Sequence, residues 1–197
     1  MACYKKFIKF AELAFFIPIS GVMNTSFEAA IDKAFRQVIN NSGVPVPAII
    51  AKYCDSLLRK NNKLSIPEDQ LEARITNAIS LFKFIDEKDI FQKFYSKALA
   101  KRLVYNTSLS SDLEGTVISQ LQNTCGFDFT SKLQRMFNDM IYSTELNVHF
   151  KTFLQKSESV MPSQFVARIL TAGAWPLSIT ESSFRIPDDV RISSNDR

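Results

Sequence analysis

Apolar residues recur every three or four positions along most of this chain, and this spacing is the strongest constraint on its fold. One stripe returns seven times in fourteen residues: Ile90, Phe91, Phe94, Tyr95, Ala98, Leu99 and Leu103. Such a period places the apolar side chains on one face of an α-helix, which must then pack against another element. We therefore predict a mainly α fold, an antiparallel helical bundle. Its other stripes cover residues 25–41, 49–60, 65–85, 111–125 and 128–154.

Local signals mark several of the expected helix ends. Capping boxes, in which Ser or Thr is followed three residues later by Glu, start at Thr25, Ser65 and Ser111. Gly126 follows the last apolar residue of its stripe, as expected of a glycine just beyond a helix C-terminus. The pattern leaves open whether Asp86 breaks a long helix or is a polar turn within it.

The composition supports a packed core. Of 197 residues, 46% are hydrophobic and 17 are Phe, whereas disordered chains are poor in such residues. Only 5 Gly argue against a Gly-rich linker or a turn-dense β fold. The residues expected to be deepest in the core sit in the middle of their stripes: Phe91, Phe94, Leu133 and Phe137.

Few side chains could support catalysis. The chain has a single histidine and three scattered cysteines, Cys3, Cys54 and Cys125, without a Cys-x-x-Cys spacing. A His-pair metal site is therefore excluded and a thiolate zinc site is not indicated. No nucleophile-elbow or phosphate-loop motif occurs. We predict a protein that is not an enzyme and needs no cofactor. The net charge of +4 permits a nucleic-acid partner but does not suggest one.

The two ends of the chain differ from the helical middle. Residues 1–24 carry three lysines and an apolar stretch of about thirteen residues, which is shorter than the ~20 that a membrane-spanning helix requires. We expect no membrane anchor there and leave the segment unassigned. Residues 165–171 alternate apolar with small or polar side chains between a proline and a glycine, which predicts a β-strand. Because few residues follow, we expect this strand to open an incomplete α/β unit over residues 158–197.

Four segments together resemble one protein family. Residues 82–103 (FKFIDEKDIFQKFYSKALAKRL) and 125–140 (CGFDFTSKLQRMFNDM) are similar to the most characteristic stretches of the cullins, the scaffolds of RING ubiquitin ligases. Residues 51–58 (AKYCDSLL) and 173–176 (GAWP) resemble two shorter cullin motifs. The four occur in the family's order, and the resemblance covers about residues 26–192.

The resemblance implies a cullin-like helical bundle over residues 25–157 and the start of the cullin α/β region after it. It implies a non-enzymatic scaffold role in ubiquitin-dependent protein catabolism, in the cytoplasm and nucleus. The motifs include no counterpart of the adaptor-binding repeats, the winged helices or the NEDD8 acceptor of a full cullin. We therefore expect a truncated product or an incomplete gene model.

The resemblance also implies two partner sites. A basic cluster of Arg59, Lys60 and Lys63 aligns with the cullin residues that receive the acidic tail of a ubiquitin-conjugating enzyme. The simpler interpretation is a basic helix end that complements the helix dipole, and both interpretations are compatible. The strand is the expected contact with the RING-box protein, through Phe165, Ile169, Leu170 and Trp175.

Two other functions stay open at this stage. The basic face of Lys93, Lys97, Lys101 and Arg102 could bind phosphates, as in a small helical nucleic-acid-binding or regulatory module, although a solvated face is the simpler interpretation. The chain could also be an inert truncated cullin fragment.

Overall fold

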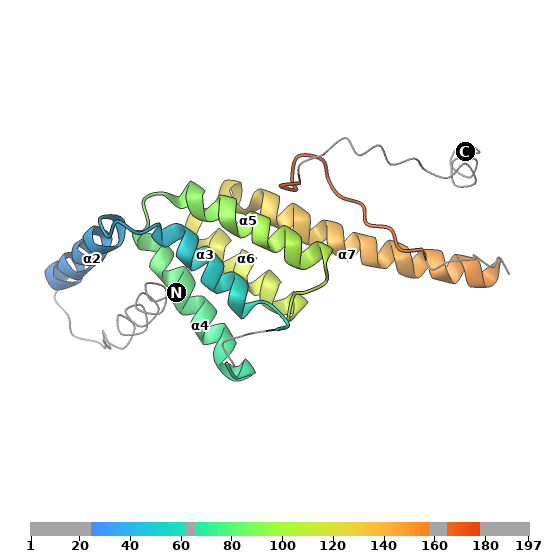
Figure 1. Cartoon of the computed structure of the whole chain (residues 1–197), viewed down its shortest axis with the longest axis horizontal. Coiled ribbons are helices and arrows are strands. Elements are labelled where there is room, and N and C mark those ends of the chain that lie inside the picture. The colour runs from blue at the N-terminus through green and yellow to red at the C-terminus, as the bar shows by residue number, and fades with distance from the viewer. Residues whose placement is uncertain (1–24, 62–65, 158–164, 178–197) are drawn as a thin grey trace.

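The computed structural model describes residues 25–61, 66–157 and 165–177 and is mainly helical there (Figure 1). The mainly α prediction is confirmed. The elements are α2 (Thr25–Asn40), α3 (Val46–Leu57), α4 (Glu68–Ser80), the 3-10 helix η1 (Leu81–Phe84), α5 (Lys88–Val104), α6 (Ser111–Cys125) and α7 (Phe127–Lys156).

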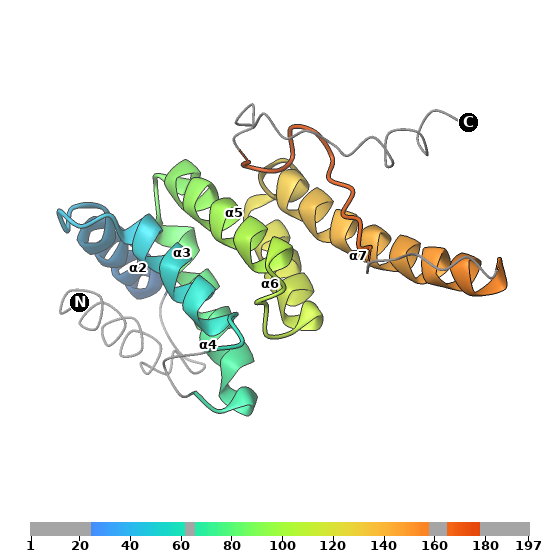
Figure 2. The same ribbon diagram turned by 45° about the vertical axis from the view of Figure 1, so that its right-hand side comes forward.

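The core lies between α3, α4, α5, α6 and the first half of α7 (Figures 1 and 2). Helix α5 contributes Phe91, Tyr95 and Leu99, which are spaced four residues apart and are at most 1% exposed. Phe91 stacks on Tyr95 with 5.3 Å between ring centroids and meets the ring of Phe82 edge-on at 4.6 Å. Such buried aromatic pairs add to the stabilisation from apolar burial alone. This core holds α3 and α5 together as the frame for the site described below.

The helical pattern is broken at Asp86, which settles the alternative that the sequence left open. The backbone becomes extended at Ile85, and α5 begins only at Lys88. Asp86 is held from α2: the Arg36 guanidinium donates to its carboxylate at 2.9 Å, and its own N–H donates to the side chain of Asn40 at 3.2 Å. The turn is therefore fixed by contacts that are 46 and 50 residues distant in the sequence.

The start of α6 is shifted by one residue from the predicted capping box. Ser110, rather than Ser111, is the N-cap, and its hydroxyl accepts from the N–H groups of Asp112 and Leu113. Glu114 does not complete the box, because its carboxylate binds the buried guanidinium of Arg102 instead. At the other end of α6, the glycine at position 126 adopts a φ of 87°, as predicted for a C-terminal glycine.

One of the four predicted core residues is wrong. Leu133 and Phe91 are at most 1% exposed and Phe137 is half-buried, whereas Phe94 is 51% exposed. The apolar stripe on α5 is wider than the face that packs. Tyr95 and Leu99 occupy the centre of that face, so Phe94, about 100° away from the centre around the helix, lies at its edge.

The predicted β-strand at residues 165–171 is also wrong. The segment is extended, but within the described residues no other strand lies beside it, and it runs along α7 (Figures 1 and 2). Helix α7 is one continuous helix of 30 residues whose second half projects beyond the bundle. The sequence pattern correctly indicated an extended backbone, but the hydrogen-bond partners are helix side chains instead of a second strand.

Candidate functional site

The predicted basic cluster lies where α3 ends. Arg59 and Lys60 follow the last turn of the helix, and Lys63 lies outside the described residues. Lys60 is exposed, and the Arg59 side chain is 42% exposed. Two members of the predicted cluster are therefore adjacent and open to solvent on one side.

This chain end is clamped to the loop between α5 and α6. Leu58 and Lys60 flank an antiparallel bridge between Arg59 and Ser108. The N–H of Leu109 donates to the carbonyl of Leu58 at 2.7 Å, and the N–H of Lys60 donates to the carbonyl of residue 107 at 3.0 Å. The bridge fixes the backbone of the basic pair, and the N–H of Leu58 donates to the carbonyl of Cys54 at 3.1 Å at this end of α3.

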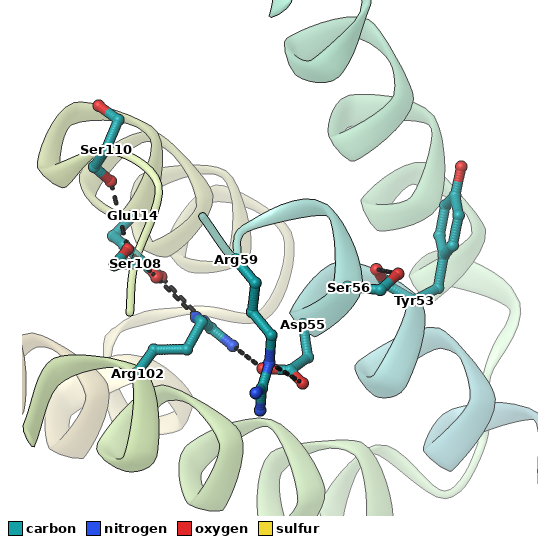
Figure 3. A network of polar contacts seen from close by, with 8 residues as sticks. All are labelled: Tyr53, Asp55, Ser56, Arg59, Arg102, Ser108, Ser110 and Glu114. Atoms are coloured by element: carbon teal, nitrogen blue, oxygen red, sulfur yellow. Dashed lines mark hydrogen bonds and ion pairs between the residues drawn. The ribbon is translucent and has the colours of Figure 1, made fainter. Parts of the chain in front are cut away.

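Beneath the clamp lies a buried ion-pair network centred on Arg102 (Figure 3). The Arg102 side chain is 0% exposed. Its Nε and Nη2 donate to the two carboxylate oxygens of Glu114 at 2.7 and 2.9 Å, and its Nη1 donates to Asp55 at 2.6 Å. The hydroxyl of Ser108 donates to Glu114 at 2.6 Å. The network thus joins α3, α5 and α6 directly under the basic pair.

Asp55 connects the network to the surface. Its second carboxylate oxygen accepts from Nε of Arg59 at 2.9 Å, one helical turn away (Figure 3). The charge of Arg59 is therefore partly balanced, whereas Lys60 forms no ion pair with any residue that the structure describes. The basic pair and the network together contain three cations, Arg59, Lys60 and Arg102. They contain only two carboxylates, Asp55 and Glu114, so one positive charge is left unbalanced, and it lies at Lys60.

The buried groups are held in single charge states. Burial by itself lowers the pKa of Arg102, but its bonds to Glu114 and Asp55 outweigh burial, so the pKa rises and the guanidinium stays charged. Burial raises the pKa of the Cys54 thiol to about 12, which keeps it neutral and unreactive at neutral pH. These side chains form a structural support under the surface cluster.

The predicted basic face on α5 is smaller than the sequence suggested. Lys93, Lys97 and Lys101 are exposed, but Arg102 points into the core network. Arg102 is therefore unavailable to a phosphate-bearing partner. In the described part of the chain, no cluster of three metal-ligating side chains occurs. None of the described helices has the length and hydropathy that a membrane span requires.

The second predicted site is the segment along α7. Asn147 binds Ala167 through two bonds, accepting from its N–H at 2.9 Å and donating to its carbonyl at 2.7 Å. One turn earlier, the Ser143 hydroxyl accepts from the N–H of Ile169 at 2.9 Å and donates to its carbonyl at 3.4 Å. The helix therefore supplies both bonds that a neighbouring strand would supply to each of these residues.

Asp139 closes this series. Its carboxylate accepts from the N–H and the hydroxyl of Thr171 and from the indole N–H of Trp175, each at 2.7 Å. Burial alone would raise the pKa of Asp139. These three hydrogen bonds and the nearby Arg135 lower the pKa by more than burial raises it, so the pKa lies below its ordinary value. The carboxylate is thus an ionised anchor for the end of the segment.

The four residues predicted to contact a RING partner differ in exposure. Phe165 and Ile169 are 51% and 61% exposed, and Leu170 is half-buried. Trp175 is only 8% exposed and is anchored within the chain. Sequence analysis missed the anchoring residues Asp139, Ser143 and Asn147. The sequence did carry a signal for these anchors, because three short polar residues at i, i+4 and i+8 lie on one face of a helix.

Residues 1–147 match the profile of the Cullin alpha solenoid domain, more than half of the chain.

The chain belongs to the cullin family. Among similar proteins, Cullin-1 of Dictyostelium discoideum is 41% identical over 177 residues, and Cullin-2 of Caenorhabditis elegans is 43% identical over 166 residues. Cullin-1 of Schizosaccharomyces pombe is 39% identical over 173 residues. These alignments cover 85%, 80% and 85% of this chain but only 23%, 21% and 22% of the three cullins. The chain thus spans less than a quarter of the length of these relatives.

The cullin match begins at residue 1 and so includes residues 1–24, which the motifs left unassigned. Those residues lie outside the described structure. Residues 127–147, the first two thirds of α7, fall inside the match and carry all three anchors of the 165–171 segment.

Proposed function

We propose that this cullin chain is a non-enzymatic scaffold element of a cullin-RING ubiquitin ligase. In this role its helical body holds two partner sites at a fixed separation. The basic cluster at the end of α3 receives the acidic tail of a ubiquitin-conjugating enzyme, and the 165–171 segment receives the RING-box protein. The ubiquitin-transfer chemistry belongs to the partners.

The clamp at the end of α3 carries this proposal. Lys60 is exposed and has no ion-pair partner among the described residues, yet its backbone is fixed by the bridge to the α5–α6 loop. A positive charge on a rigid support steers an acidic partner toward one place, and attraction by a few surface charges leaves that partner free to dissociate quickly. Those properties suit an enzyme that must bind and leave repeatedly.

The test is binding of a fluorescently labelled acidic peptide, rich in Asp and Glu, followed by fluorescence anisotropy over a series of salt concentrations. We expect weak binding that falls steeply with salt, and Lys60→Glu should weaken it by about tenfold at low salt. Lys33→Glu on α2 is the matched control, because Lys33 is also exposed but lies on a helix at the other end of the bundle (Figure 1).

Equal affinity of the two variants would contradict the proposed role of the cluster. A duplex oligonucleotide serves as a competitor in the same assay. Tight displacement of the peptide by the duplex, abolished by substituting Lys97 on α5 but not Lys60, would favour the nucleic-acid-binding alternative instead.

A further inference from the structure

Asp55 lies between a buried arginine and a surface arginine. Its Oδ1 accepts from Nη1 of Arg102 at 2.6 Å, and its Oδ2 accepts from Nε of Arg59 at 2.9 Å (Figure 3). The Asp55 side chain is 16% exposed, between the 0% of Arg102 and the 42% of Arg59. One carboxylate therefore links the interior of the bundle to the basic pair on its surface.

Asp55 is held in place from its buried side. Arg102 donates to both carboxylate oxygens of Glu114, at 2.7 and 2.9 Å, so the plane of its guanidinium is fixed and the remaining donor Nη1 meets Asp55. A carboxylate with one oxygen on a fixed, buried cation has little freedom to turn away. Its second oxygen is therefore a stationary acceptor for Arg59, four residues further along the chain.

The charges of this group balance only when Arg59 is included. Asp55 and Glu114 carry two negative charges, and inside the bundle only Arg102 opposes them. Arg59 supplies the second positive charge. If a partner drew Arg59 away, two carboxylates would share one guanidinium in a largely buried place, which is unfavourable. A partly buried pair is also screened less by salt than an exposed one, so Asp55 competes well with a carboxylate from solution.

Lys60, the next residue, has no such restraint on its side chain. It is exposed and forms no ion pair with a described residue. Only its backbone is fixed, through the N–H that donates to the carbonyl of Thr107 at 3.0 Å. Two adjacent cations thus differ in their availability to an acidic partner, although both are basic residues at the same helix end.

We propose that Asp55 is an intramolecular competitor for Arg59, and that it limits the affinity of the basic cluster for an acidic partner. This inference rests on the proposed function in that the partner is the acidic tail received by the cluster. Asp55 is a positioning residue, because it acts on the tail through Arg59. The tail is attracted by the whole cluster, but of the two described cations only Lys60 is free to meet it, so the tail dissociates quickly.

Asp55→Asn breaks the surface bond and spares the buried one. The amide keeps an oxygen that can accept from Arg102, whereas its NH2 group cannot accept from Nε of Arg59. We expect this variant to bind the labelled Asp- and Glu-rich peptide about fivefold more tightly at low salt, mainly through slower dissociation in stopped-flow measurements. Asp89→Asn, at the other end of α5, is the matched control, because it raises the net charge equally without releasing Arg59.

A double-mutant cycle with Arg59→Gln separates restraint from a simple effect of charge. Arg59→Gln removes one positive charge in either background. If Asp55 restrains Arg59, the loss of affinity should be at least about threefold larger in Asp55→Asn than in the unaltered chain. Equal losses in the two backgrounds would show that the charges act additively, and the inference would be overturned. It would also be overturned by unchanged dissociation in Asp55→Asn, or by the same slowing in Asp89→Asn.

Nitrogen-15 NMR follows the Nε–H of Arg59 directly. Without peptide, Asp55→Asn should speed exchange of this hydrogen with water by at least about tenfold, because the N–H loses its acceptor. In the unaltered chain, saturating peptide should leave the signal in place, because the N–H stays bonded to Asp55. A displacement by more than the width of the signal would contradict the inference, and this measurement decides it even if Asp55→Asn does not fold.

The outcomes also separate this inference from the proposed function. If the peptide binds neither the unaltered chain nor Asp55→Asn, the proposed role of the basic cluster is refuted, and hydrogen exchange alone decides the inference. Exchange at the Arg59 Nε–H that is no faster in Asp55→Asn would then show that Asp55 does not hold the Arg59 side chain.

Discussion

Removal of Glu114 should expose how much the bundle depends on its buried network. In Glu114→Leu, the guanidinium of Arg102 stays 0% exposed but loses both of its bonds to the carboxylate, and the hydroxyl of Ser108 loses its acceptor. Breaking a buried ion pair on one side typically costs about 3–5 kcal/mol, and Arg102 would keep only Asp55, which it shares with Arg59, to balance its charge. That loss is a large part of the ~5–15 kcal/mol that stabilises a domain.

The double variant Arg102→Met with Glu114→Leu gives the sharper result. It removes both charges and leaves apolar side chains of similar size, and Asp55 keeps its ion pair with Arg59. We expect the double variant to recover at least about 2 kcal/mol relative to Glu114→Leu alone. The assay is urea unfolding of the whole chain, followed by far-ultraviolet circular dichroism, with the slope m compared between variants.

An exposed ion pair provides the matched control. Arg36 and Asp86 also join two elements, at 2.9 Å, but their side chains are 54% and 56% exposed. Asp86→Ala should therefore cost no more than about 1 kcal/mol. If Glu114→Leu costs as little as this control, or if the double variant is less stable than Glu114→Leu, Glu114 does not stabilise the chain by balancing the charge of Arg102.

Three further predictions concern single side chains. Phe91→Ala should cost about 3–5 kcal/mol in thermal unfolding, whereas Phe94→Ala should cost less than about 1 kcal/mol, and equal losses would contradict their assigned exposures. The pKa of Asp139 is lower in the folded chain than in the unfolded chain. Its hydrogen bonds therefore hold the 165–171 segment on α7 at full strength above the ordinary carboxyl pKa of about 4, and this stabilisation is lost as the pH falls through the pKa of the folded chain. The emission of Trp175 should therefore be constant from neutral pH to about pH 5 and shift only in more acidic solution. Cys54, with its pKa raised to about 12 and 0% exposure, should resist thiol reagents in the native chain, and rapid labelling without unfolding would be inconsistent with its burial.

Local chemistry made most of the helices predictable. Their apolar stripes repeat at the helical period, and a glycine at position 126 ends α6 where an L side chain would be strained. The position of Arg59 and Lys60 at the end of α3 was also predictable, because they directly follow the last apolar residues of that stripe. The cullin motifs in residues 82–103 and 125–140 were readable because they are long and irregular.

Other features depended on side chains that are distant in the sequence. Whether Asp86 would end a helix depended on Arg36 and Asn40 of α2. Glu114 had the spacing of a capping box, but Arg102 lies within reach and forms stronger charge-assisted bonds with it.

The extended conformation of residues 165–171 could be predicted from the sequence alone, because alternating apolar and small side chains suit that backbone. Their hydrogen-bond partners became known only from the folded chain. An extended segment needs hydrogen-bond partners at its own two-residue spacing, and the three polar side chains on α7 meet that spacing only when the helix and the segment lie antiparallel in contact. Periodicity specifies the conformation of one element, whereas its partner is set by the packing of elements that the chain brings together from far apart.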